Sequence, residues 1–133
     1  MSKVLALMAA TALGLGSAAQ RGAAQVPSDL RAAILARDSA IARVDAAVWD
    51  RLTAGSFTAV LEDGTFMTKS VRLAQFRRQA PSAFTPVQGE KLTRAGTAWI
   101  RRFFDNGTWV IEVWGRTGST WQAVAVQVTT GHL

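Results

Sequence analysis

Glu112 is the carboxylate with the clearest opportunity for chemistry, because it falls in the middle of a predicted strand that is rich in tryptophan. If that strand pairs as its turns predict, Glu112 lies near Trp99 and Trp114 and works as a general base or as a polar anchor for a ligand. The competing interpretation is a cross-strand ion pair with Arg101, which favours the ionised carboxylate and makes it a poorer base. Glu112 is therefore the candidate catalytic residue, with a structural role as the alternative.

Other reactive residue types are scarce. The chain has no cysteine, which excludes thiolate metal sites and thiol nucleophiles, and its single histidine, His132, lies next to the C-terminus. Because a metal site needs several ligands, the sequence predicts no metal site and no cofactor.

Aromatic residues provide a second candidate for a binding site. The chain has five tryptophans, and aromatic walls with a few polar anchors are typical of pockets for small apolar ligands. The competing interpretation is core packing or a subunit interface, where tryptophan is also common. The candidate ligand-binding residues are Trp49, Phe57, Phe76, Trp99, Arg101, Trp114, Gln127 and Thr129.

The elements that must position these residues run from helices to strands. Apolar residues at helical spacing predict a long helix that opens near Ser28. Asp45 and Thr68 are placed to cap two further helices. The remaining predicted elements are a second helix ending near 52, a hairpin of 57–61 and 65–67, a third helix to about 79, and three long strands over about 91–104, 108–116 and 120–130.

Two tight turns fix the predicted register of the long strands. Asn106-Gly107 suits a type I′ turn because both residues tolerate positive φ, and Gly118-Ser119 is a second two-residue turn. The pairs that follow are Phe104–Trp109, Phe103–Val110, Arg102–Ile111, Arg101–Glu112, Ile100–Val113, Trp99–Trp114, Trp114–Ala123, Val113–Val124, Glu112–Ala125 and Val110–Gln127.

The two faces of this sheet differ in composition, but neither is cleanly polar, as a face open to water usually is. Both faces are therefore expected to be covered, one by the helices and the other by a partner or a ligand. The aliphatic face holds Ile100, Phe104, Ile111, Val113, Val124 and Val126, and the mixed face holds Trp99, Arg101, Glu112, Trp114, Trp121, Gln127 and Thr129.

Residues 1–24 have the three regions of a cleavable signal peptide: a positive start at Lys3, an apolar stretch over 4–15, and small residues before a cleavage site after Ala19 or Ala24. The apolar stretch is shorter than the ~20 residues that span a membrane. We therefore expect residues 25–133 to form one exported domain, periplasmic or secreted, with no stable membrane anchor.

The charge of the chain is basic but dispersed. Loss of Lys3 and Arg21 with the leader lowers the formal net charge from +6 to about +4. The arginines are spread without a basic run, and nucleic-acid binding requires a clustered basic surface, so no nucleic acid is expected as a partner.

Short motifs, taken in order, resemble the nuclear transport factor 2-like superfamily and, within it, the SnoaL-like family called domain of unknown function 4440. The motifs are Arg-Val-Asp-Ala-Ala at 43–47 leading to 57–58, Asp-Gly-Thr-Phe-Met-Thr-Lys at 63–69, and 113–114 followed by 121–129. The resemblance implies a cone-shaped α+β fold, with N-terminal helices packed on a curved antiparallel sheet. It also implies a homodimer and a pocket between helices and sheet.

Relatives in this superfamily include ketosteroid isomerase-like and polyketide cyclase-like enzymes. The isomerase type pairs a carboxylate base with a tyrosine-containing oxyanion site, and this chain has no tyrosine. The preferred function is therefore an exported homodimeric domain that binds a small, mostly apolar molecule. The alternatives are a cofactor-independent isomerase, lyase or cyclase that uses Glu112, and a protein assembly module.

Overall fold

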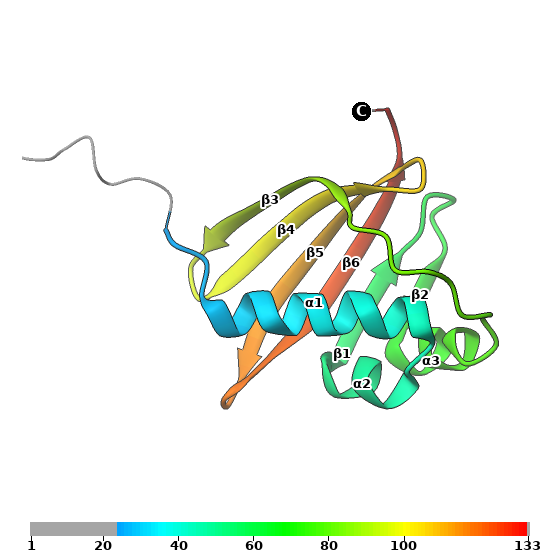
Figure 1. The fold of residues 1–133 in the computed structure, drawn as a ribbon, viewed down its shortest axis with the longest axis horizontal. Coiled ribbons are helices and arrows are strands. Elements are labelled where there is room, and N and C mark those ends of the chain that lie inside the picture. The colour runs from blue at the N-terminus through cyan, green and yellow to red at the C-terminus, as the bar shows by residue number, and fades with distance from the viewer. Residues whose placement is uncertain (1–23, 133) are drawn as a thin grey trace, which may run out of the picture.

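The computed structural model describes residues 24–132, which form an α+β fold of three helices and a curved six-stranded sheet (Figure 1). The sheet order is β2-β1-β6-β5-β4-β3. In chain order the elements are α1 (Ser28–Arg43), α2 (Ala46–Arg51), β1 (Thr53–Val60), β2 (Phe66–Thr68), α3 (Lys69–Phe76), β3 (Gln88–Ala95), β4 (Ala98–Asp105), β5 (Thr108–Thr117) and β6 (Thr120–Thr130).

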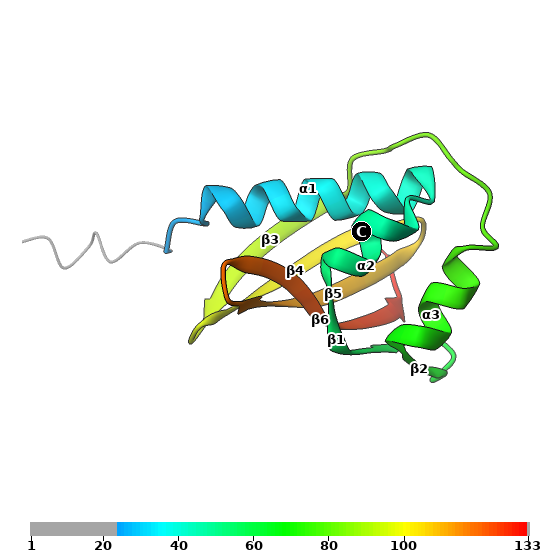
Figure 2. The same ribbon diagram turned by 90° about the horizontal axis from the view of Figure 1, so that it is seen from below.

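The helices cover one face of the sheet, and α1 runs across it, as Figure 2 shows from below. Two helix caps follow the sequence prediction: Asp45 accepts a hydrogen bond from the amide of Val48, and Thr68 accepts one from the amide of Val71. The third helix ends at Phe76, short of the predicted residue 79, because the chain closes there with tighter turns such as Gln79 N to Phe76 O.

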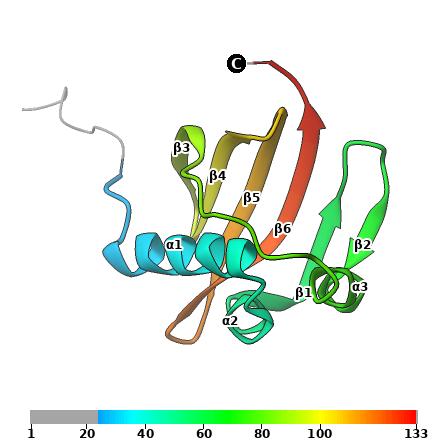
Figure 3. The same ribbon diagram turned by 45° about the vertical axis from the view of Figure 1, so that its right-hand side comes forward.

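The sheet is mixed, whereas the sequence predicts an antiparallel one. β1 and β6 pair in parallel, and the other neighbouring strands are antiparallel. Tight turns dictate antiparallel pairing only between consecutive strands, and β1 reaches β6 through a long connection. Figure 3 shows β1 and β2 at one side of the sheet, with α3 following β2 and packing against β1.

The predicted single strand over 91–104 is wrong, because two strands occupy this part of the chain. β3 and β4 form a hairpin in which Ala95 pairs with Ala98. Gly96 has a φ of +61°, a left-handed conformation that glycine adopts without steric cost. This glycine therefore ends one strand and starts the return.

The predicted β4–β5 hairpin is confirmed throughout its register. Asn106 and Gly107 have φ values of 45° and 80°, as a type I′ turn requires. All six predicted pairs are present, including Arg101 with Glu112 and Trp99 with Trp114. The turn chemistry therefore places an arginine and a glutamate directly opposite each other.

The β5–β6 register holds near its turn and then shifts. Trp114 pairs with Ala123 as predicted, but Val113 pairs with Ala125, so Val124 is an extra residue in a β-bulge. Beyond the bulge each predicted pair is wrong by one position: Glu112 faces Val126, and Val110 faces Val128. A shift of one residue moves side chains to the other face of the sheet.

The helices cover the face that carries Trp99, Trp114 and Trp121, whereas Trp109 lies on the opposite face. Trp99, Trp114 and Trp121 are buried there. On the opposite, aliphatic face Ile100 and Ile111 remain 37% and 41% exposed. These two side chains are therefore not covered by the rest of the described chain, and the cover of this second face by a partner or a ligand stays a prediction.

The predicted leader lies outside the described residues, except for Ala24. Among residues 24–132, the structure contains no helix with the length and apolarity needed to cross a membrane.

Candidate functional site

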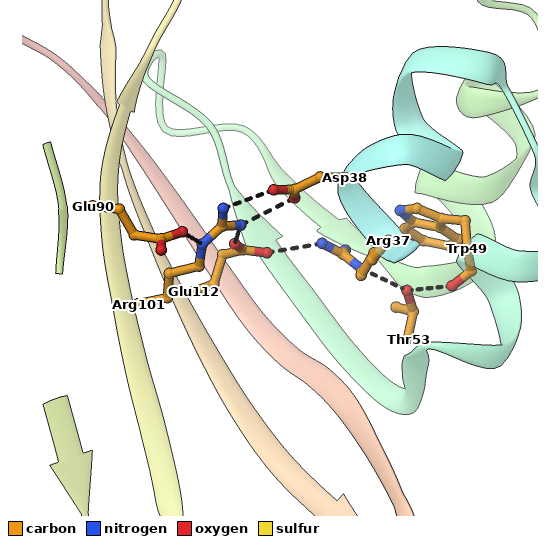
Figure 4. A network of polar contacts seen from close by, with 7 residues as sticks. All are labelled: Arg37, Asp38, Trp49, Thr53, Glu90, Arg101 and Glu112. Atoms are coloured by element: carbon orange, nitrogen blue, oxygen red, sulfur yellow. Dashed lines mark hydrogen bonds and ion pairs between the residues drawn. The ribbon is translucent and has the colours of Figure 1, made fainter. Parts of the chain in front are cut away.

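A buried ionic cluster lies between α1 and the sheet, with Arg101 at its centre (Figure 4). The Arg101 side chain is 1% exposed and donates to three carboxylates. Its Nε donates to Glu90 at 2.7 Å, and its Nη1 and Nη2 donate to the two oxygens of Asp38 at 3.0 and 2.7 Å. Nη1 also donates to Glu112 Oε1 at 2.7 Å. All three guanidinium nitrogens therefore have carboxylate acceptors.

Glu112 links this group to a second buried arginine. Its Oε1 accepts from Arg101, and its Oε2 accepts from Arg37 Nη1 at 2.8 Å. The predicted cross-strand ion pair is confirmed. Both oxygens of Glu112 thus accept charge-assisted hydrogen bonds from buried arginines, which stabilise its ionised form.

Arg37 has fewer partners than Arg101, although its side chain is 4% exposed. Its Nε donates to Thr53 Oγ1 at 3.2 Å, and that hydroxyl donates to the carbonyl of Trp49 at 2.6 Å. The remaining nitrogen, Nη2, has no hydrogen-bond partner among residues 24–132. Three aromatic rings lie 5.4–5.9 Å from the guanidinium carbon, those of Trp49, Phe57 and Trp114.

The electrostatic states of the two arginines differ accordingly. Burial lowers the pKa of Arg37, and the charge of Glu112 only partly offsets it. Burial also disfavours the charge of Arg101, but hydrogen bonds and charges from Asp38 and Glu112 outweigh it and raise the pKa of Arg101 above its ordinary value. The positive charge of Arg37 is thus the less compensated of the two.

Arg37 lies in the wall of a cavity of about 370 Å³, which we name the Arg37 cavity. The cavity lies between the helices and the covered face of the sheet. Its polar wall includes Glu112 and the half-buried Arg72. Its apolar wall comes from α1, the β1–β2 hairpin and the central strands, and includes Ile41, Phe57, Ala59, Met67, Val126 and Val128.

Comparison with known proteins identifies the architecture. No family model and no curated protein matches the chain. A nuclear transport factor 2-like protein from Cytophaga hutchinsonii superposes with a TM-score of 0.70 at 13% identity, over 77% of this chain and 95% of that one. The fold is nuclear transport factor 2-like.

Two further solved structures share this nuclear transport factor 2-like fold. One is a nuclear transport factor 2-like protein of unknown function in nutrient uptake from Rhodospirillum rubrum, with a TM-score of 0.66, 18% identity, and 78% of this chain and 99% of that one covered. The other is the association domain of CaMKII from C. elegans, with a TM-score of 0.65, 16% identity, and 77% and 93% covered.

Within this nuclear transport factor 2-like fold, some predicted site residues meet in the Arg37 cavity. Trp49, Phe57 and Glu112 all line it. Trp49 also stacks on Phe76, with ring centroids 5.6 Å apart. The structure therefore brings the helix-side aromatics and the candidate carboxylate together around one space.

Three predicted aromatic residues lie outside that wall. Phe76 and Trp114 are fully buried, Trp99 is 4% exposed, and all three belong to the core cluster. Trp114 Nε1 is buried without a hydrogen-bond partner among the described residues, as is Trp121 Nε1. These three positions match the alternative prediction, core packing.

The remaining predicted residues are elsewhere. Arg101 lines a second cavity of about 370 Å³ on the other side of the cluster, next to Glu90 and Leu92. Gln127 and Thr129 are exposed, and they pair with Ile111 and Trp109 on the far side of the sheet. The placement of Gln127 and Thr129 on the mixed face is wrong, because the bulge at Val124 reverses their direction.

Sequence reasoning missed Arg37, although a signal was present. Arg37 continues the helical stripe of Leu30, Ile34 and Ile41, at a spacing that places all four residues on one face of α1. A charged residue within such an apolar stripe is predicted to be buried together with its apolar neighbours. Val126 was predicted on the aliphatic face, which is wrong, because the bulge turns it toward the cavity. Arg72 was missed because the sequence of a short helix does not distinguish an arginine that points inward from one that points to solvent.

No group of three or more metal-ligating side chains is positioned to hold a metal ion within residues 24–132. The cavity offers hydrogen-bond donation from Arg37 and Arg72 beside an apolar wall. The other polar side chains of the lining are Asp38, Gln75, Gln79, Asp105 and Glu112.

Proposed function

We propose that the protein is an exported, homodimeric domain that binds a small, mostly apolar molecule in the Arg37 cavity. The observation that carries the proposal is the cavity itself, a space of about 370 Å³ between helices and sheet. Volumes of this order are typical of small-molecule pockets, which combine apolar walls with a few placed polar groups. Phe57, Met67 and Val126 supply such walls, and Arg37 supplies a donor.

The hydrogen bonds of Glu112 favour binding without catalysis over proton-transfer chemistry. Both of its oxygens are engaged by arginines, at 2.7 and 2.8 Å. The SnoaL-like assignment, and with it an isomerase, lyase or cyclase activity, stays a prediction from the sequence motifs.

The homodimer is proposed from the exposed aliphatic face. Ile100 and Ile111 lie on a strand pair whose other face is already packed on the helices. A second copy would cover this face and remove its apolar surface from water. The change Ile111→Lys is expected to shift the mass measured by light scattering from dimer to monomer. Thr65→Lys, in the exposed turn before β2, is the matched control and should leave the mass unchanged.

An assembly module is the second candidate, favoured by the shared fold with the association domain of CaMKII. In that case the exposed sheet face would be the functional surface and the cavity would stay empty. Native mass spectrometry of the protein from its exported fraction separates the two functions. A dimer that carries a discrete additional mass supports ligand binding. A dimer that stays free of adducts, even after incubation with cell extract, contradicts it and favours assembly.

The same spectrum tests export, because removal of the leader after Ala19 or Ala24 gives a defined mass. An intact chain of 133 residues in that fraction would contradict cleavage.

A further inference from the structure

The unmatched donor of Arg37 indicates what the cavity binds. Arg37 is 3% exposed, lines the cavity and leaves Nη2 without a hydrogen-bond partner among the described residues. The two fully buried side-chain nitrogens without a partner among the described residues belong to Trp114 and Trp121, so Nη2 of Arg37 opens into the cavity, where an acceptor can reach it. The aromatic rings around the guanidinium attract its charge but offer no oxygen acceptor.

A second positive charge lies in the same cavity. Arg72 of α3 is half-buried in the wall and forms no ion pair within residues 24–132. Arg72 also lies near enough to add to the effect of burial in lowering the pKa of Arg37. Two positive charges that line one cavity would both be stabilised by an anion bound there.

The acids near the cavity do not supply that anion. Asp38 and Glu112 hold Arg101, and Glu112 shares its other oxygen with Arg37. Glu90 lies on the far side of Arg101 and also approaches Arg31 at 3.9 Å. Asp105 lines the cavity but is exposed to solvent. Arg72 is thus the charge that remains without a partner after the cluster is balanced.

We infer that the ligand of the Arg37 cavity is a small monocarboxylate, whose carboxylate group accepts hydrogen bonds from Arg37 Nη2 and Arg72 while its apolar body lies against Phe57, Met67 and Val126. The inference rests on the proposed binding function and names its ligand class. A single negative charge matches the single unpaired arginine. A planar carboxylate also matches guanidinium donors in geometry.

The test uses two pairs of probes that have the same shape and differ in charge: phenylacetate with phenylacetamide, and hexanoate with hexanamide. Titration calorimetry measures each pair on the mature protein. We expect the carboxylates to bind about tenfold or more tightly than the amides, since a charge-assisted hydrogen bond contributes more than a neutral one. The preference should shrink as salt is added.

Arg72→Gln is the decisive variant, because Arg72 takes no part in the buried cluster and its loss should leave the fold intact. It is expected to weaken carboxylate binding about tenfold and to leave amide binding unchanged. Arg77→Gln, just beyond the end of α3 and exposed, is the matched control and should change neither. If Arg37→Gln also loses the preference for carboxylates over amides, Arg37 contributes to carboxylate binding as well.

The outcomes separate the inference from the function on which it rests. Equal binding of acids and amides, or a preference that survives Arg72→Gln, would overturn the carboxylate assignment and leave the pocket function standing. Failure of all four probes to bind the folded protein at millimolar concentration would overturn both.

Discussion

Two arginines on opposite sides of Glu112 have the same chemistry and nearly the same burial, but different surroundings. Arg101 has carboxylate acceptors at all three nitrogens, whereas Arg37 has one carboxylate, one hydroxyl and an unmatched Nη2. Each arginine also lines its own cavity. Burial of a charge therefore does not by itself mark a functional group, and the count of matched donors distinguishes a structural arginine from one with binding capacity.

The difference follows from the elements that surround each side chain. Arg101 projects from β4 and meets acids from β3, β5 and α1. Arg37 projects from α1 toward Trp49, Phe57 and Trp114, which have no acidic group to offer. The aromatic side of the cluster thus leaves a charge partly unmatched, and a ligand can match it.

The largest expected effect is on stability, from Arg101→Met. This change leaves Asp38 and Glu90 as carboxylates without their main partner, and breaking a buried ion pair from one side costs about 3–5 kcal/mol. Urea denaturation should show a fall of that order in the free energy of unfolding. Arg102→Met, on the exposed side of the same strand, is the control and should cost little. A cost for Arg101→Met below that of its control would refute the structural role.

Arg37→Met is expected to cost less, about 1–3 kcal/mol, because Glu112 keeps its hydrogen bond from Arg101 after Arg37 is removed. The same urea experiment compares the two variants directly. If Arg37→Met destabilises the protein as much as Arg101→Met, the unmatched Nη2 of Arg37 does not distinguish the two arginines in their contribution to stability.

The sequence predicted much of the fold because its signals are local. Asn106-Gly107 fixes a hairpin and its register through backbone conformation alone, and Asp45 and Thr68 cap the helices that follow them. The parallel β1–β6 pair and the bulge at Val124 lack such a signal. Both depend on how distant segments pack, which no short motif encodes.

The site was predictable only as far as the register held. Arg101 and Glu112 were paired correctly from one turn, whereas Gln127 was placed on the wrong face because the bulge lies between it and the second turn. The unmatched state of Arg37 depends on partners from α2, β1 and β5 together, so the helical stripe alone shows its burial but not its free donor.

Thr53→Val tests the hydrogen bonds that hold Arg37 in place. The variant keeps the shape of the side chain but removes the acceptor of Arg37 Nε and the donor to the Trp49 carbonyl. We expect a loss of about 1 kcal/mol in the free energy of unfolding, typical of one buried hydrogen bond. Thr58→Val, in the same strand, has no side-chain hydrogen bond among those described and serves as control. No difference between the two would show that the hydroxyl does not hold Arg37.

Glu112→Gln has the smallest expected effect on ligand binding, and the direction of that effect is decisive. The variant also breaks two buried ion pairs, so the calorimetry has to use protein shown to be folded. Removing this charge deprives Arg37 of its carboxylate partner while Arg101 keeps Asp38 and Glu90, so Arg37 should attract an anion more strongly. Calorimetry should show phenylacetate binding about threefold more tightly than to the unchanged protein, with phenylacetamide unaffected. Weaker binding of both probes would instead mean that Glu112 touches the ligand itself, as a polar anchor or base does. The direction of the change in affinity therefore decides whether Arg37 or Glu112 contacts the ligand.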